Sequence, residues 1–305
     1  MEVLIRFGVF IAMFAAVAML EAWRPRRAPT ENRWRRWRVN IGLVALDVVL
    51  QRLTIGAAAV AAAVYAGQHH WGLLALVAWP WWPRAVAGFL ALDFALYLQH
   101  VMSHALPVFW RFHRVHHADL DLDVTSGLRF HPIEIGVSLL YKVLLVAALG
   151  VDPWVVLTFE AVLNASALFT HGNIRLPAGL DRALRLVLVT PDMHRIHHSV
   201  VVAETNSNFG FFLSGWDRLC GTARRDPASD HEDMALGLPA HRDQRRLGLP
   251  HLLAMPFLPD PAPPATAAAA ALAVPRPAAA DAPRPNPRRA PGSARRSRPS
   301  GSVAP

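Results

Sequence analysis

Two histidine triplets with the same spacing are the features of this chain most able to do chemistry. They occur in HRVHH and HRIHH, and a sparser pair in HVMSH lies just upstream of the first triplet. Histidines three and four residues apart project from one face of a helix, and imidazole is the commonest metal-binding side chain. Two triplets and a pair, all attached to hydrophobic segments, therefore predict a clustered metal centre.

The supply of histidines exceeds what one structural zinc ion needs. A tetrahedral site takes about four ligands, whereas the histidines near these motifs suffice for two ions. An imidazole-rich set without paired cysteines suits zinc, iron, copper or nickel rather than calcium or magnesium. The available histidines are His100, His104, His113, His116, His117, His171, His194, His197 and His198.

The composition indicates that these histidines belong to a membrane protein. Hydrophobic residues make up 53% of the 305 residues and charged residues only 17%, against about 25% charged residues in soluble domains. Part of the formal charge of +9 lies in an arginine-rich segment at residues 24–38. Because this segment separates two apolar stretches, it predicts a solvated positive-inside loop and not a nucleic-acid site.

Apolar segments of membrane-spanning length predict an all-α polytopic fold with four or five main transmembrane helices. They run from about 3 to 22, 41 to 66, 84 to 106 and 133 to 170. The last is interrupted near Gly150–Pro153 and predicts a hairpin that returns to the same side. A short apolar stretch near residues 72–82, rich in tryptophan, predicts an interfacial segment.

Placing the arginine-rich loop in the cytoplasm fixes the side on which the histidines lie. The third segment then leaves the membrane on the cytoplasmic side, and the hairpin starts and ends there. The pair, both triplets, His131 and His171 all fall on this face as a helical, histidine-rich cap. The Ala-, Arg- and Pro-rich composition suggests a bacterial source. The expected location is therefore the bacterial inner membrane, with the active site facing the cytoplasm.

The chain divides into three expected regions. Residues 1–84 hold N-terminal transmembrane helices and the basic loop, residues 85–256 form the catalytic domain, and residues 257–305 form a Pro/Ala/Arg-rich tail expected to be disordered. Among the polar residues, Asp93 either orients a ligand or packs as a buried helix aspartate. The acidic run DLDLD, with Asp119, Asp121 and Asp123, is predicted to form a solvated loop.

The ordered motifs around the histidines resemble those of the fatty acid hydroxylase/sterol desaturase superfamily. The similarity covers about Asp93 to Thr222, through DFALYLQHVMSH, FWRFHRVHHADLDLDVTSGLRFHPIE, THGNIRLP and TPDMHRIHHSVVVAETNSNFGFFLSGWDRLCGT. Members are integral membrane enzymes with a cytoplasm-facing, histidine-held di-iron centre that hydroxylates or desaturates lipids. The resemblance implies an O2-dependent oxidoreductase with two iron ions and no catalytic residue beyond the metal ligands.

The resemblance also implies which histidines are ligands. The HVMSH pair matches the HxxxH box of the family, the triplets match two HxxHH boxes, and His171 matches an isolated ligand between them. His131, in FHP, recurs in many members but not in all, so a ligand role and a structural role stay equally open. Val101 departs from the pattern, since members often have arginine there, and this affects a supporting contact. The implied ligands are His100, His104, His113, His116, His117, His131, His171, His194, His197 and His198.

The implied activity is hydroxylation or desaturation of an apolar lipid that enters from the bilayer. Sterols, fatty acyl chains, carotenoids and ether lipids are all candidates, and the sequence does not choose among them. The reaction uses O2 and two external electrons, and a separate reductase is expected because no flavin, haem or ferredoxin motif is visible. The alternative is a membrane metal-binding or transport protein without oxidation chemistry. A bis-histidine haem protein does not fit HxxHH motifs at membrane exits, and the complete histidine set argues against an inactive family member.

Overall fold

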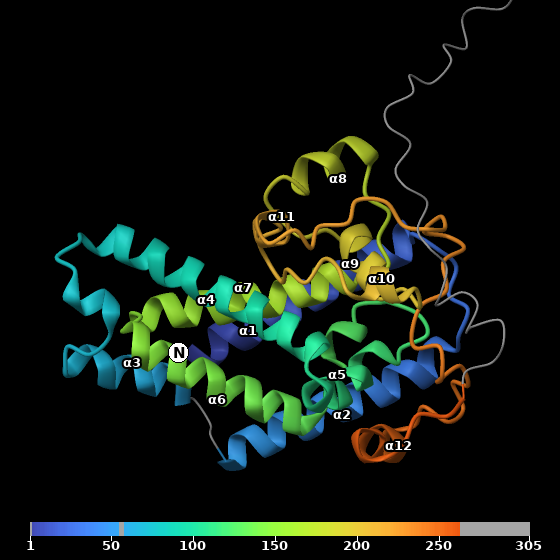
Figure 1. Cartoon of the computed structure of the whole chain (residues 1–305), viewed down its shortest axis with the longest axis horizontal. Helices are drawn as coiled ribbons and strands as arrows, with labels where there is room; N and C mark the ends of the chain where they lie inside the picture. The colour runs from blue at the N-terminus through green and yellow to red at the C-terminus, as the bar shows by residue number, and fades with distance from the viewer. Residues whose placement is uncertain (1, 55–57, 263–305) are drawn as a thin grey trace, which may run out of the picture. The chain divides into compact units, whose positions relative to one another are not determined.

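The computed structural model describes residues 2–54 and 58–262, and within these ranges it contains helices, turns and three isolated bridges but no strand. Figure 1 shows this helical arrangement, which confirms the predicted all-α fold. The helices are α1 (Glu2–Trp23), α2 (Arg33–Thr54), α3 (Ala58–Gln68), η1 (Leu73–Leu76), α4 (Trp81–Ala105), α5 (Pro107–His117), η2 (Ser126–Leu128), α6 (Pro132–Leu149), α7 (Pro153–His171), α8 (Ala178–Leu184), α9 (Pro191–His197), α10 (Val202–Thr205), α11 (Gly215–Leu219), α12 (Leu249–Ala254) and η3 (Met255–Phe257).

Five stretches of the described residues are long and apolar enough to cross a membrane, as predicted for a polytopic membrane protein. The second differs in detail from the expected segment at residues 41–66. Its first helix, α2, begins already at Arg33, and residues 55–57, before α3, lie outside the described residues. The five stretches are Arg6–Trp23, Arg33–Leu76, Trp81–Ala105, Pro132–Leu149 and Pro153–His171.

The predicted hairpin is confirmed as α6 and α7, and local sequence explains its turn. Gly150 ends α6 in the left-handed conformation, with φ 68°, which glycine adopts without steric cost. The Asp152 carboxylate then accepts a hydrogen bond from the backbone N–H of Trp154 at 2.9 Å, and Pro153 occupies the first position of α7. Gly72 packs against this turn so closely that a Cβ there would lie 2.1 Å from the Gly150 nitrogen.

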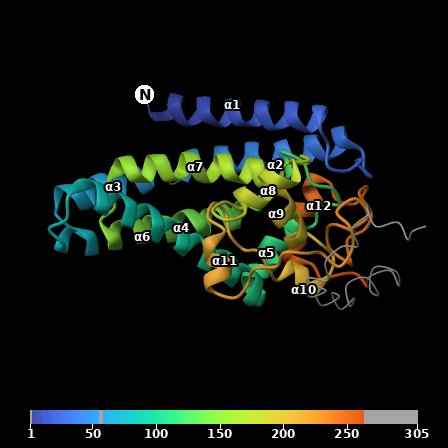
Figure 2. The ribbon, with the colours of Figure 1, turned by 90° about the horizontal axis from the view of Figure 1, so that it is seen from above.

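Two apolar clusters hold the long helices together. One joins α3, α4, α6 and α7 around buried residues such as Leu92, Val156 and Phe159. The other joins α1 to α7 through Val17 and Leu168, and Figure 2 shows α1 running alongside α7. Because α4 and α7 both end in histidines, this packing brings His104 and His171 to the same end of the bundle.

The acidic run after the first triplet is not a solvated loop, so that prediction is wrong. Asp119, Asp121 and Asp123 are all buried. The guanidinium of Arg36, itself 1% exposed, donates to Asp119 at 2.7 and 2.8 Å and to Asp123 at 2.6 Å. Burial alone would raise the pKa of Asp119, but the Arg36 charge holds that pKa well below its usual range. Arg36 therefore belongs to a buried network and not to the solvated basic loop expected from the sequence.

Ordered contacts continue into the first residues of the predicted tail. The Asp260 carboxylate accepts hydrogen bonds from Arg114 at 2.6 Å and from His241 at 3.0 Å. Arg114 lies inside the first histidine triplet, so residues up to Asp260 support the helix that carries it. The rest of the predicted disordered tail, residues 263–305, lies outside the described residues.

Candidate metal centre

Four helices supply the histidines, and only α4 and α5 follow each other directly in the sequence. α4 carries the first pair near its C-terminal end, α5 the first triplet, and α7 ends at His171. The short helix α9 carries the second triplet, with His198 as its C-terminal cap. Nine of the ten predicted residues come together in two adjoining groups, and in each group the candidate ligand atoms lie within 4.8 Å of one another.

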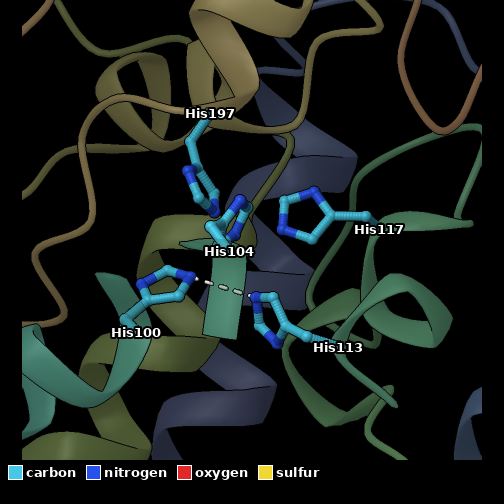
Figure 3. A group of neighbouring side chains, drawn as sticks. All are labelled: His100, His104, His113, His117 and His197. Atoms are coloured by element: carbon cyan, nitrogen blue, oxygen red, sulfur yellow. Dashed lines mark hydrogen bonds between the residues drawn. The ribbon is translucent and has the colours of Figure 1, made fainter. Parts of the chain in front are cut away.

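The five-histidine group consists of His100, His104, His113, His117 and His197. Figure 3 shows the five rings converging on a common centre from three directions. The Nε2 atoms of His100 and His113 are 3.1 Å apart. Two nitrogens that share one ion, at about 2.1 Å each, lie about 3 Å apart. The spacing therefore fits one transition-metal ion.

The four-histidine group consists of His116, His171, His194 and His198. The Nε2 atom of His171 lies 3.1 Å from that of His116 and 3.0 Å from that of His194. The Nε2 atoms of His194 and His198 are 3.2 Å apart. All four side chains are buried, and the spacing again fits a single ion.

Each triplet contributes to both groups, in opposite ways. In the first triplet His113 and His117 belong to the five-histidine group and His116 to the other. In the second triplet the first and last histidines belong to the four-histidine group, and His197 belongs to the five-histidine group. Around the helix axis, residue i+4 is rotated by about 40° from residue i, whereas residue i+3 is rotated in the opposite direction. The i, i+4 pair therefore serves one group and the i+3 residue the other.

Hydrogen bonds at the second ring nitrogen orient two rings of the five-histidine group, His100 and His113. The Nδ1 atom of His100 donates to the Phe209 carbonyl at 2.7 Å, and that of His113 donates to the Glu134 carboxylate at 2.6 Å. A neutral imidazole with its proton on Nδ1 has only a lone pair on Nε2. In this tautomer the two Nε2 atoms, 3.1 Å apart, can both offer a lone pair to one metal cation.

The same arrangement occurs in the four-histidine group. Nδ1 of His116 donates to the Arg129 carbonyl at 3.2 Å, and Nδ1 of His171 donates to the Ala167 carbonyl at 2.7 Å. Their Nε2 atoms, 3.1 Å apart, again have no proton to share. Protein groups that hold the second nitrogen of a ligand histidine in this way orient the ring toward a metal.

The electrostatic environment favours the neutral form of five of the six triplet histidines. Burial, followed by the proximity of the other histidines, lowers the pKa of all five triplet histidines for which a shift is found. A neutral ring is the form that binds a metal ion. In addition, the buried Nε2 atoms of His117 and His197 have no hydrogen-bond partner among the described residues, as expected of metal-binding atoms. The five histidines with a lowered pKa are His116, His117, His194, His197 and His198.

His131 is the one predicted residue that the structure does not bring into either group. Its Nδ1 atom accepts a hydrogen bond from the Ile133 backbone N–H at 3.1 Å and so caps α6. Its Nε2 atom donates to the Leu253 carbonyl at 3.2 Å. Both ring nitrogens are thus engaged in the fold, which corresponds to the structural role that the sequence left open.

Sequence reasoning missed Glu134, although it lies within the quoted FHPIE motif. Its carboxylate accepts a hydrogen bond from His113, and its place in the first turn of α6, just after the His131 cap, was the available signal.

Asp93 forms no hydrogen bond with a candidate ligand among the described residues. It accepts hydrogen bonds from the Trp216 indole at 2.7 Å and the Leu213 backbone at 3.3 Å. Of its two predicted roles, Asp93 therefore has the packing role.

Comparison with known proteins identifies the family. The sequence model of the family described as "Fatty acid hydroxylase" matches residues 85–222, a range that contains all ten predicted histidines. The chain is 32% identical, over 242 residues, to "Ornithine lipid hydroxylase OlsE" of Rhizobium tropici, covering 75% of this chain and 70% of that protein. The chain belongs to the fatty acid hydroxylase family. This confirms the resemblance seen in the histidine motifs and the prediction of an oxidoreductase enzyme.

Other relatives of this fatty acid hydroxylase family member are similar over a smaller part of their length. Human "Alkylglycerol monooxygenase" is 28% identical over 160 residues, which cover 52% of this chain and 33% of the relative. Human "Cholesterol 25-hydroxylase" is 26% identical over 137 residues, which cover 44% of this chain and 49% of the relative. No solved structure matches the chain significantly.

Proposed function

We propose that each histidine group holds one iron ion and that the chain hydroxylates a C–H bond of a membrane lipid. The convergence of buried Nε2 atoms in both groups, about 3.1 Å apart, is the observation that carries this proposal, because one cation can accept the lone pairs of both rings. The nine residues of the two groups are the proposed ligands, and residues 85–256 are the proposed catalytic region. Two adjoining ions supply O2 activation with two electrons, which suits attack on an unactivated C–H bond.

The chain's own residues hold and shield the centre. Carbonyl and carboxylate acceptors fix the ring planes of five proposed ligands before any ion binds. These are His100, His113, His116, His171 and His197. The rings of Phe209 and Phe211 lie 5.5 and 4.9 Å from that of His100. These aromatic side chains line one side of the five-histidine group and limit the access of water, which protects a strong oxidant from side reactions.

Hydroxylation is favoured over desaturation by the relatives, which are named as hydroxylases or monooxygenases of three lipid classes. The proposed reaction consumes the C–H bond, O2, two electrons and two protons, and it yields the alcohol and water. The electrons come from a separate reductase. Metal transport is less well supported, because two of the three carboxylates at membrane level, Glu160 and Asp93, are engaged with Lys142 and Trp216. The third, Asp47, lies alone on α2.

The decisive experiment for this function is lipid mass spectrometry under ¹⁸O2. Cells with the protein are expected to contain a lipid that has gained one labelled oxygen atom, and cells without it are not. His117→Ala should abolish the product, whereas His251→Ala, outside both groups, should retain it. A lipid that loses two hydrogens would contradict hydroxylation, and the absence of any changed lipid would contradict the enzyme proposal.

We also propose that the centre faces the cytoplasm, where electron donors are available. The lone cysteine, Cys220, can be replaced by serine, and a single cysteine then introduced at Gln68 or at Ser229, both exposed. A membrane-impermeant maleimide applied to intact cells is expected to label Gln68→Cys and not Ser229→Cys, while both react after lysis. Labelling of Ser229→Cys on intact cells would place the histidines on the opposite side.

A further inference from the structure

A groove of about 700 Å³, lined largely by charged residues, opens beside the C-terminal end of α1. Its lining includes Arg24, the residue directly after the membrane-spanning stretch Arg6–Trp23. The side chain of Trp23 is 74% exposed, and tryptophan concentrates where membrane and water meet. The groove therefore lies at the depth of lipid head groups.

Helix α8 separates this groove from an apolar surface. Leu180 on α8, and Leu186 and Val187 just after it, are exposed by 48%, 71% and 58%. Large apolar side chains exposed next to a spanning helix indicate contact with acyl chains. The opposite side of α8, which lines the groove at helical spacing, is formed by Ala178, Asp181, Arg182 and Arg185.

The loop that packs on α8 also reaches membrane depth. The Phe212 ring lies 5.9 Å from that of Phe89, which is well inside the spanning helix α4. Arg218, in the neighbouring α11, donates to the Arg185 carbonyl at 2.9 Å and so joins this loop to α8. The apolar edge of α8 is thereby held beside a transmembrane helix, as lipid contact requires.

The groove carries charges of both signs that form no ion pair among the described residues. Within the described residues, Arg24, Arg182 and Arg225 form no ion pair with a carboxylate, and Asp226 and Asp230 form none with a basic group. Guanidinium groups bind phosphate and carboxylate through paired N–H donors. Free carboxylates in turn attract an ammonium group. A ligand with both charges matches this lining better than a purely anionic one.

We propose that this groove binds the zwitterionic head group of a bilayer lipid. The phosphate or carboxylate of the head group lies against the three arginines, its ammonium group lies against the two aspartates, and the acyl chains follow the apolar edge of α8. Asp192, which also lines the groove, is two residues before His194 of the four-histidine group. Resting on the proposed function, this position makes zwitterionic lipids the substrate class.

Lipid retention by the full-length protein tests this site without turnover. The protein is kept free of reductant, and native mass spectrometry measures its binding of phosphatidylethanolamine and phosphatidylglycerol. The wild type is expected to bind phosphatidylethanolamine at least threefold more tightly. Arg182→Ala/Arg225→Ala should weaken that binding at least fivefold, and both side chains are exposed, so the fold should remain. The matched control Arg245→Ala/Arg246→Ala removes two exposed arginines outside the groove and should bind as the wild type does.

Three outcomes would overturn the groove proposal. These are unchanged phosphatidylethanolamine binding in the groove variant, equal binding of phosphatidylglycerol by the wild type, and displacement of the lipid by an equal concentration of free phosphoethanolamine. Failure of the proposed function has a different signature. In that case lipid binding still depends on the groove arginines, but the ¹⁸O2 experiment yields no oxygenated lipid.

Discussion

Replacing His117 with alanine is expected to remove the metal ion of the five-histidine group and to leave that of the four-histidine group. The purified variant should then hold about one metal per chain instead of two. His198→Ala should empty the four-histidine group instead. The two rings stack with centroids 4.5 Å apart, so these substitutions are matched in position and differ in group. Either change should lower hydroxylation at least 100-fold, because both ions are needed for two-electron chemistry.

Elemental analysis gives the metal count, and Mössbauer spectra of ⁵⁷Fe-loaded protein should show that each variant loses a different iron component. His251→Ala, outside both groups, should keep two metals. Two metals in both ligand variants would contradict the assignment, and loss of every metal from each would contradict two separable groups. Zinc in overproduced protein would not contradict it, since zinc outcompetes iron(II) at nitrogen ligands.

Replacing Arg36 with methionine is expected to lower the free energy of unfolding by about 3–5 kcal/mol, the usual effect of removing one partner of a buried ion pair. Asp119 and Asp123 would be left buried without the guanidinium that neutralises them. The damage should extend to the metal centre. The Arg129 carbonyl orients His116, and Arg129 itself donates to Asn40, one turn after Arg36 on α2. Metal should therefore be lost first from the four-histidine group.

The prediction is tested by measuring, for each variant in detergent, the midpoint of denaturation and the number of metal ions per chain. Arg38→Met is the matched control, because Arg38 lies on the same helix and is exposed. It should change stability by at most about 0.5 kcal/mol. Arg36→Met/Asp119→Leu should recover part of the loss, since it removes one of the stranded charges. Equal stability of Arg36→Met and Arg38→Met would show that the buried network does not support the fold.

Much of the architecture could be predicted because its signals are local. Apolar segments of bilayer length gave the spanning helices, and Gly150 and Pro153 marked the hairpin turn in the sequence. The second segment was located less well. Arg33 and Arg36 placed the early turns of α2 in the predicted basic loop, although Arg36 has buried partners more than 80 residues away. Charge by itself does not reveal such a partner.

The burial of the acidic run could not be predicted from the sequence for the same reason. A sequence with three aspartates in five residues suggests exposure, because charged side chains are rarely buried unless they are paired. Only the packing of α2 against η2 supplies the pairing, and it turns a predicted solvated loop into a buried network. The role of His131 was undecided for a similar reason, since its contact with the Leu253 carbonyl joins residues 122 positions apart.

The sequence by itself determined the type of chemistry, because residue types and i, i+3, i+4 spacing fix which side chains a helix can present together. It therefore identified all nine clustered histidines and the family. Tertiary structure alone decided how they are shared between two groups. That division depends on the angle at which α5 and α9 approach each other and the ends of α4 and α7. Helix spacing sets directions within one helix, whereas a metal site is closed by packing between helices.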